Sequence, residues 1–402
     1  MINTLQATIL KIRLAAASAA LIFVVVLGAA VFTPRSAQAQ TFSDLYSFTG
    51  GSDGGEPLEG VLRDKAGNLY GTTFQNGAGF GVVFKVTATG TESVLYTFTG
   101  GADGGDPYPS LIMDTAGNLY GTTFAGGSSN CAGGCGVVFK VDKNGKETVL
   151  YSFKGGTTDG CGPGAPLIRD KAGNFYSTTG TCGASNFGTV FKLTKSGKET
   201  VLHSFGGTPS DGQYPYYGAL LMDKLGNLYG VTDTGGASGE GALFKLSKSG
   251  KETLLHSFAG GSDGFLVFGG PVADKAGNLY GTADDGGSSN AGIVWKVSKK
   301  GKETVLHTFT GGTSDGANPI AGVILDAKGN LYGQTSSGGA SGDGTVYELD
   351  TKGKITLLHS FDGSDGGTPW AGLLLRDAKG NFYGTTMAGG SGGKGTVWQI
   401  TK

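Results

Sequence analysis

Four histidines recur at one place in a repeated string, and this regularity raises the question of a metal site. Each occupies the second position of L-[HY]-[ST]-F, and earlier copies of the string carry tyrosine there. The residues at this position are Tyr46, Tyr96, Tyr151, His203, His256, His307 and His359. A position that accepts either residue serves packing, and copies on separate repeats lie too far apart to share an ion. We therefore predict a structural role and no metal site.

An aspartate in a glycine-rich loop recurs in all seven repeats, so a ring of carboxylates that binds a hard cation is one interpretation. No D-x-D-x-D spacing concentrates ligands within a single loop, and a turn-forming aspartate is the favoured alternative. These loops lead into the innermost strand of each repeat, so the aspartates are expected near a central channel. They are Asp53, Asp103, Asp159, Asp211, Asp263, Asp315 and Asp365.

Two glycine-rich strings, at residues 50–54 and 260–264, match the hydrolase elbow G-x-S-x-G. That motif needs a strand, a sharp turn and a helix, whose backbone N–H groups stabilise an oxyanion. Here the string joins two expected strands, and other repeats replace the serine by Ala102 or Thr158. We predict turns at both places and no nucleophile.

Four cysteines occur, all in the second and third repeats. An exported protein folds under oxidising conditions, which favour disulfides. Cys131 and Cys135 share one loop, whereas Cys161 lies where the chain enters the third repeat and Cys182 lies in the loop between that repeat's second and third strands, on the same face. The predicted pairs are Cys131–Cys135 and Cys161–Cys182. The alternative, four unrelated buried residues, is disfavoured because the other five repeats have no cysteine.

The elements that must position these residues are strands. The string D-x-x-G-N-[LF]-Y occurs seven times, with its asparagine at 68, 118, 174, 227, 278, 330 and 381. Each copy lies among four short apolar segments bounded by Gly, Asp, Asn or Ser, which is a strand pattern. In the sixth repeat the segments are residues 321–325, 330–335, 344–349 and 354–361.

Seven repeats of four antiparallel strands predict an all-β fold, a seven-bladed β-propeller. A solenoid or a string of separate sheets is the alternative. Residues 41–48 resemble a fourth strand, whereas the C-terminal residues 395–402 resemble a third strand that has no fourth. The N-terminal strand is therefore expected to complete the last blade and close the ring. Residues 40–402 are expected to form one domain, with no second domain.

The first 39 residues resemble a cleavable export signal. Lys11 and Arg13 precede an apolar run from Leu14 to Phe32, and residues 37–39 read Ala-Gln-Ala. An uncleaved membrane anchor is the alternative, because the run is long enough to span a bilayer. We predict cleavage before Gln40 and a secreted or periplasmic protein that has no further membrane segment.

The strings G-N-L-Y-G-T-T and G-T-V-F-K-L resemble the Gloeo/Verruco tandem repeat of exported bacterial proteins. The resemblance extends from Thr41 to Lys402. It implies a surface or secreted protein and assigns no biochemical role. Members often carry a C-terminal sorting segment, and we expect none here because the sequence ends on a repeat strand.

Residues that differ between repeats are better candidates for ligand binding than residues fixed in all seven. A proline follows most loop aspartates, and the residue after it varies, with several aromatic side chains at or near this place. Such rings suit a stacked sugar or an apolar partner surface. The alternative is an apolar plug in the top of the channel. The predicted site comprises Tyr108, Tyr214, Tyr216, Phe265, Phe268 and Trp370, and Tyr217 lies beside it.

The innermost segments bring no His, Glu or Asn cluster together, so we predict no catalytic residue, metal or cofactor. The net charge of −1 gives no reason to expect nucleic acid as a partner. The predicted function is a monomeric binding or scaffold module for a glycan or a protein. The alternatives are a structural envelope protein and a carbohydrate hydrolase or lyase that uses Asp233, Asp284 and Asp285.

Overall fold

The apolar segments form strands because neighbouring sheets cover both of their faces. Strand β4 (Val82–Val86) buries every residue except Lys85, and the third strand of each other sheet repeats this pattern over its first five residues. The structure is a computed structural model that describes residues 40–75, 79–207 and 209–401, of which Phe42–Thr401 form one compact unit. The description below concerns that unit.

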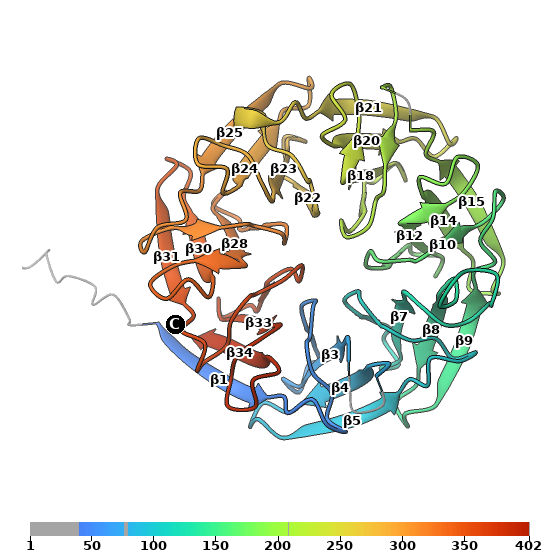
Figure 1. The fold of residues 1–402 in the computed structure, drawn as a ribbon, viewed down its shortest axis with the longest axis horizontal. Helices are drawn as coiled ribbons and strands as arrows, with labels where there is room; N and C mark the ends of the chain where they lie inside the picture. The colour runs from blue at the N-terminus through green and yellow to red at the C-terminus, as the bar shows by residue number, and fades with distance from the viewer. Residues whose placement is uncertain (1–39, 76–78, 208, 402) are drawn as a thin grey trace, which may run out of the picture. The chain divides into compact units, whose positions relative to one another are not determined.

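Seven four-stranded antiparallel sheets, here blades 1–7, stand around a ring as a β-propeller (Figure 1). From the axis outward, the strands of blades 1–3 are β2 (Leu62–Arg63), β3 (Leu69–Thr73), β4 and β5 (Glu92–Thr97); β6 (Ile112–Met113), β7 (Leu119–Thr123), β8 (Val137–Val141) and β9 (Glu147–Ser152); β11 (Ile168–Arg169), β12 (Phe175–Thr179), β14 (Thr189–Leu193) and β15 (Glu199–Ser204). Those of blades 4 and 5 are β17 (Leu221–Met222), β18 (Leu228–Thr232), β20 (Ala242–Leu246) and β21 (Glu252–Ser257); β22 (Gly269–Ala273), β23 (Leu279–Ala283), β24 (Ile293–Val297) and β25 (Glu303–Thr308). Those of blades 6 and 7 are β27 (Ile324–Leu325), β28 (Leu331–Thr335), β30 (Thr345–Leu349) and β31 (Ile355–Ser360); β32 (Leu375–Arg376), β33 (Phe382–Thr386), β34 (Thr396–Thr401) and β1 (Thr41–Ser47).

The ring closes as the sequence predicts. Strand β1 lies beside β34 and supplies the outer strand of blade 7 (Figure 1). Just beyond β1, the N–H of Phe48 donates to the carbonyl of Gly395 at 2.9 Å, and the Phe48 ring is fully buried. The first described strand therefore completes the last blade.

The innermost strands are shorter than predicted. Residues 321–325 were expected to form a strand, but β27 contains only Ile324 and Leu325. Closer to the axis the chain packs against neighbouring backbone. A Cβ on Gly322 would lie 2.9 Å from the Gly270 carbonyl oxygen of blade 5. Blade 5 has valine in place of the proline found in other blades, and its inner strand β22 extends over five residues.

Three additional two-stranded ribbons join loops on one side of the ring. They pair β10 (Gly160–Cys161) with β13 (Thr181–Cys182), β16 (Gly212–Gln213) with β19 (Thr234–Gly235), and β26 (Gly316–Ala317) with β29 (Ser337–Gly338). A short 3-10 helix, η1 (Gly261–Asp263), occupies the loop before blade 5. The G-x-S-x-G string at residues 260–264 is thus part of a turn between strands, as predicted.

Aromatic side chains fill the space between blades. The ring of Trp295 on β24 lies over Gly281 on the adjacent strand, where an added Cβ would be 2.3 Å from the ring. Six blades share this glycine and aromatic pair, as predicted. In blade 3 a serine, Ser177, replaces this glycine, and its hydroxyl donates to the Ala165 carbonyl at 2.9 Å. These residues are core.

The ring has two faces with different loops. Turns between the first and second strands and between the third and fourth strands lie on one face, here the turn face. Loops between blades and between the second and third strands lie on the other, here the loop face. On the turn face the D-x-x-G-N-[LF]-Y strings share a set of hydrogen bonds to the aspartate, except that in blade 6 the Asn330 side-chain amide donates to Glu348 at 2.9 Å. In blade 4, Asp223 accepts from the Leu225 and Asn227 N–H groups, the Asn227 amide and the Tyr229 hydroxyl.

The predicted export signal, residues 1–39, lies outside the described residues. Within the part of the chain that the structure describes, no helix has the length and apolar character needed to cross a membrane.

Candidate functional site

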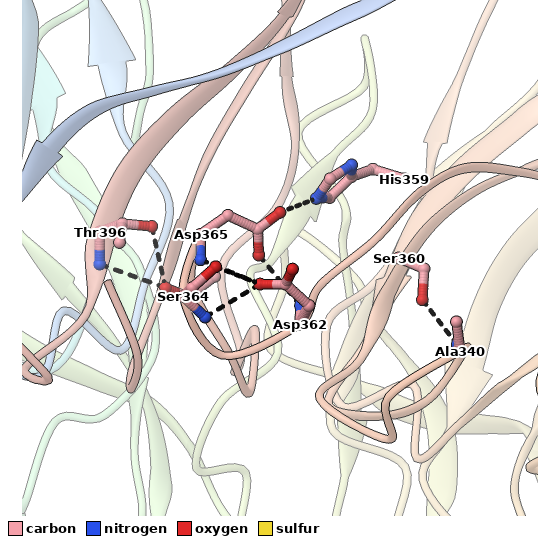
Figure 2. A network of polar contacts seen from close by, with 8 residues as sticks. Ala340, His359, Ser360, Asp362, Ser364, Asp365 and Thr396 are labelled. Carbon is pink, nitrogen blue, oxygen red and sulfur yellow. Dashed lines mark hydrogen bonds and ion pairs between the residues drawn. The ribbon is translucent and has the colours of Figure 1, made fainter. Parts of the chain in front are cut away.

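The loop aspartates organise turns. In the loop that leads from blade 6 to blade 7, His359 Nε2 on β31 lies 2.7 Å from Asp365 Oδ2, and the N–H of Asp362 donates to Asp365 Oδ1 at 3.0 Å (Figure 2). The Tyr46 hydroxyl makes the equivalent contact with Asp53 at 3.0 Å. The same pair of positions is in contact in each of the other five blades. The Asp and His or Tyr positions therefore serve the turns, as predicted.

The position of these aspartates differs from the prediction. They were expected to line the central channel, but each contacts a Tyr or His on the outermost strand of its blade. The expectation of a channel ring is therefore wrong. The physical reason is that the loop begins at the outer strand, and the aspartate caps its first residues before the chain turns inward.

A second loop feature gives every blade the same backbone and different side chains. The residue before the loop proline has a positive φ, for example 57° at Glu56 and 55° at Asp106. Its carbonyl accepts the N–H of the residue that follows the second strand, 3.1 Å for Phe74 and 2.9 Å for Phe124. Three side chains per blade therefore occupy fixed places and vary in type. In blade 2 they are Asp106, Tyr108 and Phe124.

Blade 3 carries glycine at all three variable places, Gly162, Gly164 and Gly180. A Cβ on Gly180 would lie 1.9 Å from the Tyr216 ring, and one on Gly162 would lie 3.0 Å from the Phe124 ring. The aromatic rings of blades 2 and 4 can therefore lean over blade 3. These three glycines are here called the glycine floor.

A pocket of about 310 Å³ lies at this place and is here called the aromatic pocket. Its lining comprises Phe74, Asp106, Tyr108, Phe124, Gly164, Tyr216 and Tyr217. Four rings form a closed circuit: centroid separations are 5.7 Å for Tyr108–Phe124 and 6.3 Å for Phe124–Tyr216. Those for Tyr216–Tyr217 and Tyr217–Tyr108 are 5.9 and 6.0 Å. The Phe124 side chain is 36% exposed, so the circuit presents apolar surface to solvent.

Polar groups in the aromatic pocket are few. Asp106 contributes the one carboxyl of its lining, and burial raises the pKa of this group. Burial, followed by the charge of Asp106, also raises the pKa of the Tyr108 hydroxyl. The tyrosine hydroxyls therefore stay neutral at physiological pH and are available to donate hydrogen bonds.

The structure brings four of the six predicted site residues into one group of touching rings. Tyr108 and Tyr216 line the aromatic pocket, and Tyr214 stacks on Tyr216 with centroids 6.0 Å apart. Phe268 contacts Tyr217 at 5.2 Å. Among the described residues, Phe265 and Trp370 make no ring contact with this group and line neither pocket described here.

A second pocket, of about 220 Å³, occupies the central channel and is here called the channel pocket. All seven blades contribute to its lining, which is largely Gly, Ala, Leu and Pro. Glu59 is the one charged residue of that lining and is 3% exposed. Its Oε2 accepts the Ser110 hydroxyl at 3.0 Å, whereas Oε1 has no partner among the described residues. Burial raises the pKa of Glu59 to about 8.

The three acids of the predicted hydrolase alternative lie on the loop face of blades 4 and 5. Asp233 is buried, which raises its pKa well above the ordinary value. Burial, then the neighbouring Asp285, raises the pKa of Asp284 to about 7. None of the three lines the aromatic pocket or the channel pocket.

Both predicted disulfides are present, Cys131–Cys135 and Cys161–Cys182, and the described residues include no free cysteine. Sulfur atoms of Cys131, Cys161 and Cys182 lie within 4.8 Å of one another. As members of disulfides they are not thiolate ligands. The Cys161–Cys182 bond joins the two strands of the ribbon beside the glycine floor.

Several lining residues were not predicted from the sequence: Phe74, Phe124, Asp106, Glu59 and Ser110. An alignment of the blades contains a signal for Glu59. Its counterparts in blades 2–7 are Pro109, Ala165, Tyr217, Gly269, Ala321 and Ala371. A carboxyl among such residues is a clear departure from the repeat.

A model of the Gloeobacter/Verrucomicrobia repeat matches residues 28–220, 131–295 and 267–402. No curated protein matches the sequence. Among solved structures, the chain is similar to extracellular domains of a candidate one-component system and a candidate hybrid two-component system of B. thetaiotaomicron. The TM-score is 0.55 for both, with 11% and 12% identity over 90% and 89% of this chain.

This chain spans only 40% and 39% of the length of those two structures. A candidate 6-phosphogluconolactonase of Bacteroides uniformis aligns with a TM-score of 0.47 and 14% identity, over 74% of this chain and 83% of that one. Identities this low show the fold alone. The family model covers the entire propeller, and the chain therefore belongs to the Gloeobacter/Verrucomicrobia repeat family.

Proposed function

We propose that this protein is an exported binding protein that holds a sugar ring in the aromatic pocket. The observation that carries the proposal is the circuit of four rings above the glycine floor, open to solvent and 310 Å³ in volume. Sugars present apolar C–H faces that stack on aromatic rings, and a volume near 300 Å³ suits a small ligand. Asp106 and the tyrosine hydroxyls supply the hydrogen bonds that orient it.

Export is supported by the chemistry of the cysteines. All four form disulfides within the described residues, and disulfides persist in oxidising compartments. Cleavage of the N-terminal segment stays a prediction, to be checked by the intact mass of the exported chain. A mature chain that starts at Gln40 is the expected result.

A glycan array with the purified protein, followed by calorimetry on the best glycan, tests the proposal. Removing one stacked ring, in Phe124→Ala or Tyr216→Ala, should weaken binding about fivefold, since one stacking contact contributes about 1 kcal/mol. Trp370→Ala is the matched control. Trp370 is the blade 7 counterpart of Tyr216, but it lies outside the aromatic pocket.

Gly180→Ala probes the glycine floor without removing a ring. The new methyl group would displace the Tyr216 ring, and binding should fall as it does in Tyr216→Ala. The proposal fails if no glycan binds, or if Trp370→Ala weakens binding as much as the pocket variants do. Turnover of the bound glycan would instead favour an enzyme, with Asp284 as the first acid to replace.

A further inference from the structure

We infer that the channel pocket is a second binding site, which takes a small organic cation with a primary ammonium group. The site goes beyond the proposed sugar site, because its lining residues differ except for Tyr217. Glu59 would bind the ammonium group, and the rings of Tyr217 and Phe268 would cover its apolar part.

Glu59 is not needed by the fold. Six of seven blades build the same backbone with Pro, Ala, Gly or Tyr at this position. Burial of a carboxyl in apolar surroundings costs free energy unless the group gains a partner. Among the described residues, the Ser110 hydroxyl alone donates to this carboxyl; it reaches Oε2 at 3.0 Å, and Oε1 has no partner. The burial of Glu59 costs free energy, and its carboxyl lines the channel pocket with one oxygen atom unpartnered. This carboxyl is therefore placed to bind a ligand in that pocket.

The surroundings favour a cation. The ionisable groups of the lining are the Glu59 carboxyl and the Tyr217 phenol, and the Tyr217 ring contacts Phe268 at 5.2 Å. Burial raises the pKa of the Tyr217 phenol, with further contributions from Tyr108, Asp233, Tyr216 and Glu59, so the phenol stays neutral. Aromatic faces attract an ammonium group, and no lysine or arginine of the lining competes for Glu59.

The size of the pocket limits the ligand. A volume of 220 Å³ is below the range of about 300–1,000 Å³ that holds drug-sized molecules. Ser110, Tyr217 and Phe268 are only partly buried, so the pocket is reached from solvent. A short alkylammonium ion fits these limits, and n-butylammonium is a suitable probe.

Binding should be coupled to proton release. Free Glu59 is mostly protonated at pH 7, because its pKa is raised to about 8. An ammonium ion pairs with the carboxylate, so the proton leaves Glu59 as the ion enters. We expect about one proton released per ion at pH 7, and affinity about tenfold higher at pH 7 than at pH 6.

Calorimetry of n-butylammonium at pH 7 in two buffers of different ionisation enthalpy measures the number of protons released, and a titration at pH 6 measures the change in affinity. The neutral probe 1-butanol should bind at least tenfold more weakly. Glu59→Gln keeps the size and the Ser110 contact, and it should abolish both the ammonium binding and its pH dependence. Glu56→Gln is the matched control. This carboxyl lies three residues earlier, contacts Lys394 at 3.1 Å and lines neither pocket.

Thermal unfolding of Glu59→Gln at pH 8 checks that the variant is folded. Absence of millimolar binding by the parent protein would overturn the inference. Equal binding by Glu59→Gln, or equal binding of 1-butanol, would also overturn it. Phe124→Ala separates the two sites, because it should weaken glycan binding and leave n-butylammonium binding unchanged.

Discussion

The turn face and the loop face differ in how their side chains are used. On the turn face a carboxyl such as Asp114 accepts hydrogen bonds from the backbone N–H groups of Ala116 and Asn118, the Asn118 side-chain amide and the Tyr120 hydroxyl. Although burial alone would raise it, these bonds lower the pKa of Asp114 to about 2. The same string occupies this place in all seven blades. The polar atoms of these side chains are therefore used in hydrogen bonds that hold the turns.

On the loop face the backbone is equally regular, but the residue types at the three variable places differ from blade to blade. Blade 3 has only glycine there, blades 2 and 4 have aromatic rings, and blade 5 has Asp284. Here burial raises the pKa of Asp106 and of Asp284, opposite in direction to the turn aspartates. At these two varied places the carboxyl is partly buried without being fully hydrogen-bonded, and Asp284 Oδ1 has no partner among the described residues. The difference supports our proposal that ligands bind on the loop face.

Opening the ring should have the largest effect, and it should destroy both faces together. Deletion of residues 41–48 removes the outer strand of blade 7 and the fully buried Phe48 ring. Loss of that ring alone, in Phe48→Ala, should cost about 3–5 kcal/mol. The deletion should exceed this cost and expose a sheet edge, with aggregation as the result. Thermal unfolding and light scattering measure both. A monomeric deletion variant as stable as the parent would contradict closure.

Removal of the longer disulfide should act on the loop face alone. The Cys161–Cys182 bond closes a loop with a sequence separation of 21, and the double variant Cys161→Ser/Cys182→Ser should lose about 3 kcal/mol. Hydrogen exchange should increase around the glycine floor and stay unchanged in the turn at Asp223. The double serine variant of Cys131 and Cys135 is the control, because its bond closes a shorter loop. Equal loss of protection on both faces would contradict the comparison.

Single residues from the two faces should then separate stability from binding. Asp223→Ala removes the acceptor of four hydrogen bonds and should cost about 2 kcal/mol. Phe124→Ala removes a ring that is 36% exposed, and it should change stability by less than about 1 kcal/mol. Chemical denaturation measures the stability of both variants. Glycan affinity should fall more in Phe124→Ala than in Asp223→Ala, the reverse of their order in stability. Equal destabilisation by the two variants would remove the distinction.

The parts of this fold that could be predicted follow from the number and order of the repeated segments. Seven copies of one string predict seven blades, and the fourth-strand string at residues 41–48 predicts closure. The cysteine pairs followed because both belong to loops on one face. Each of these features depends on the order of segments along the chain, which the sequence contains directly.

The aromatic pocket depended on distances across blades that the sequence does not contain. Phe124 was overlooked because it follows the second strand, far in sequence from the varied residue after the proline. Backbone hydrogen bonds between the two segments, from the Phe124 N–H to the Asp106 carbonyl and between Gly105 and Ala125, bring these places together. Trp370 was predicted because it is aromatic at the varied place, yet its neighbours lack the glycine floor. The space left by absent side chains decided where the pocket formed.

The smallest expected effect is a pH dependence of stability caused by glutamates of the fourth strands. Five fourth strands begin with a glutamate whose pKa is raised to about 7, first by burial and then by a nearby aspartate: Glu92, Glu147, Glu199, Glu252 and Glu303. The folded state holds these protons more tightly than the unfolded chain, whose glutamates titrate near pH 4.5. Their contribution to stability is therefore full below about pH 4.5 and is lost as pH rises through 7.

The melting temperature should accordingly fall between pH 5 and pH 8. Burial lowers the pKa of His359, which acts in the opposite direction near pH 6.5, so the glutamates must be tested directly. Glu252→Gln should raise stability slightly at pH 8 and leave it nearly unchanged at pH 5. Each glutamate is only partly buried, so solvent screening keeps the effect small.

Blade 6 supplies the natural control, because Ile355 begins its fourth strand at the same place. Glu303→Ile copies that arrangement into blade 5 and should flatten the pH dependence as Glu252→Gln does. Thermal unfolding of both variants between pH 5 and 8 provides the measurement. A slope identical to that of the parent protein would show that these glutamates do not titrate differently in the folded state. The pH dependence of stability would then have to come from other groups, such as His359 and the buried carboxyls of the loop face.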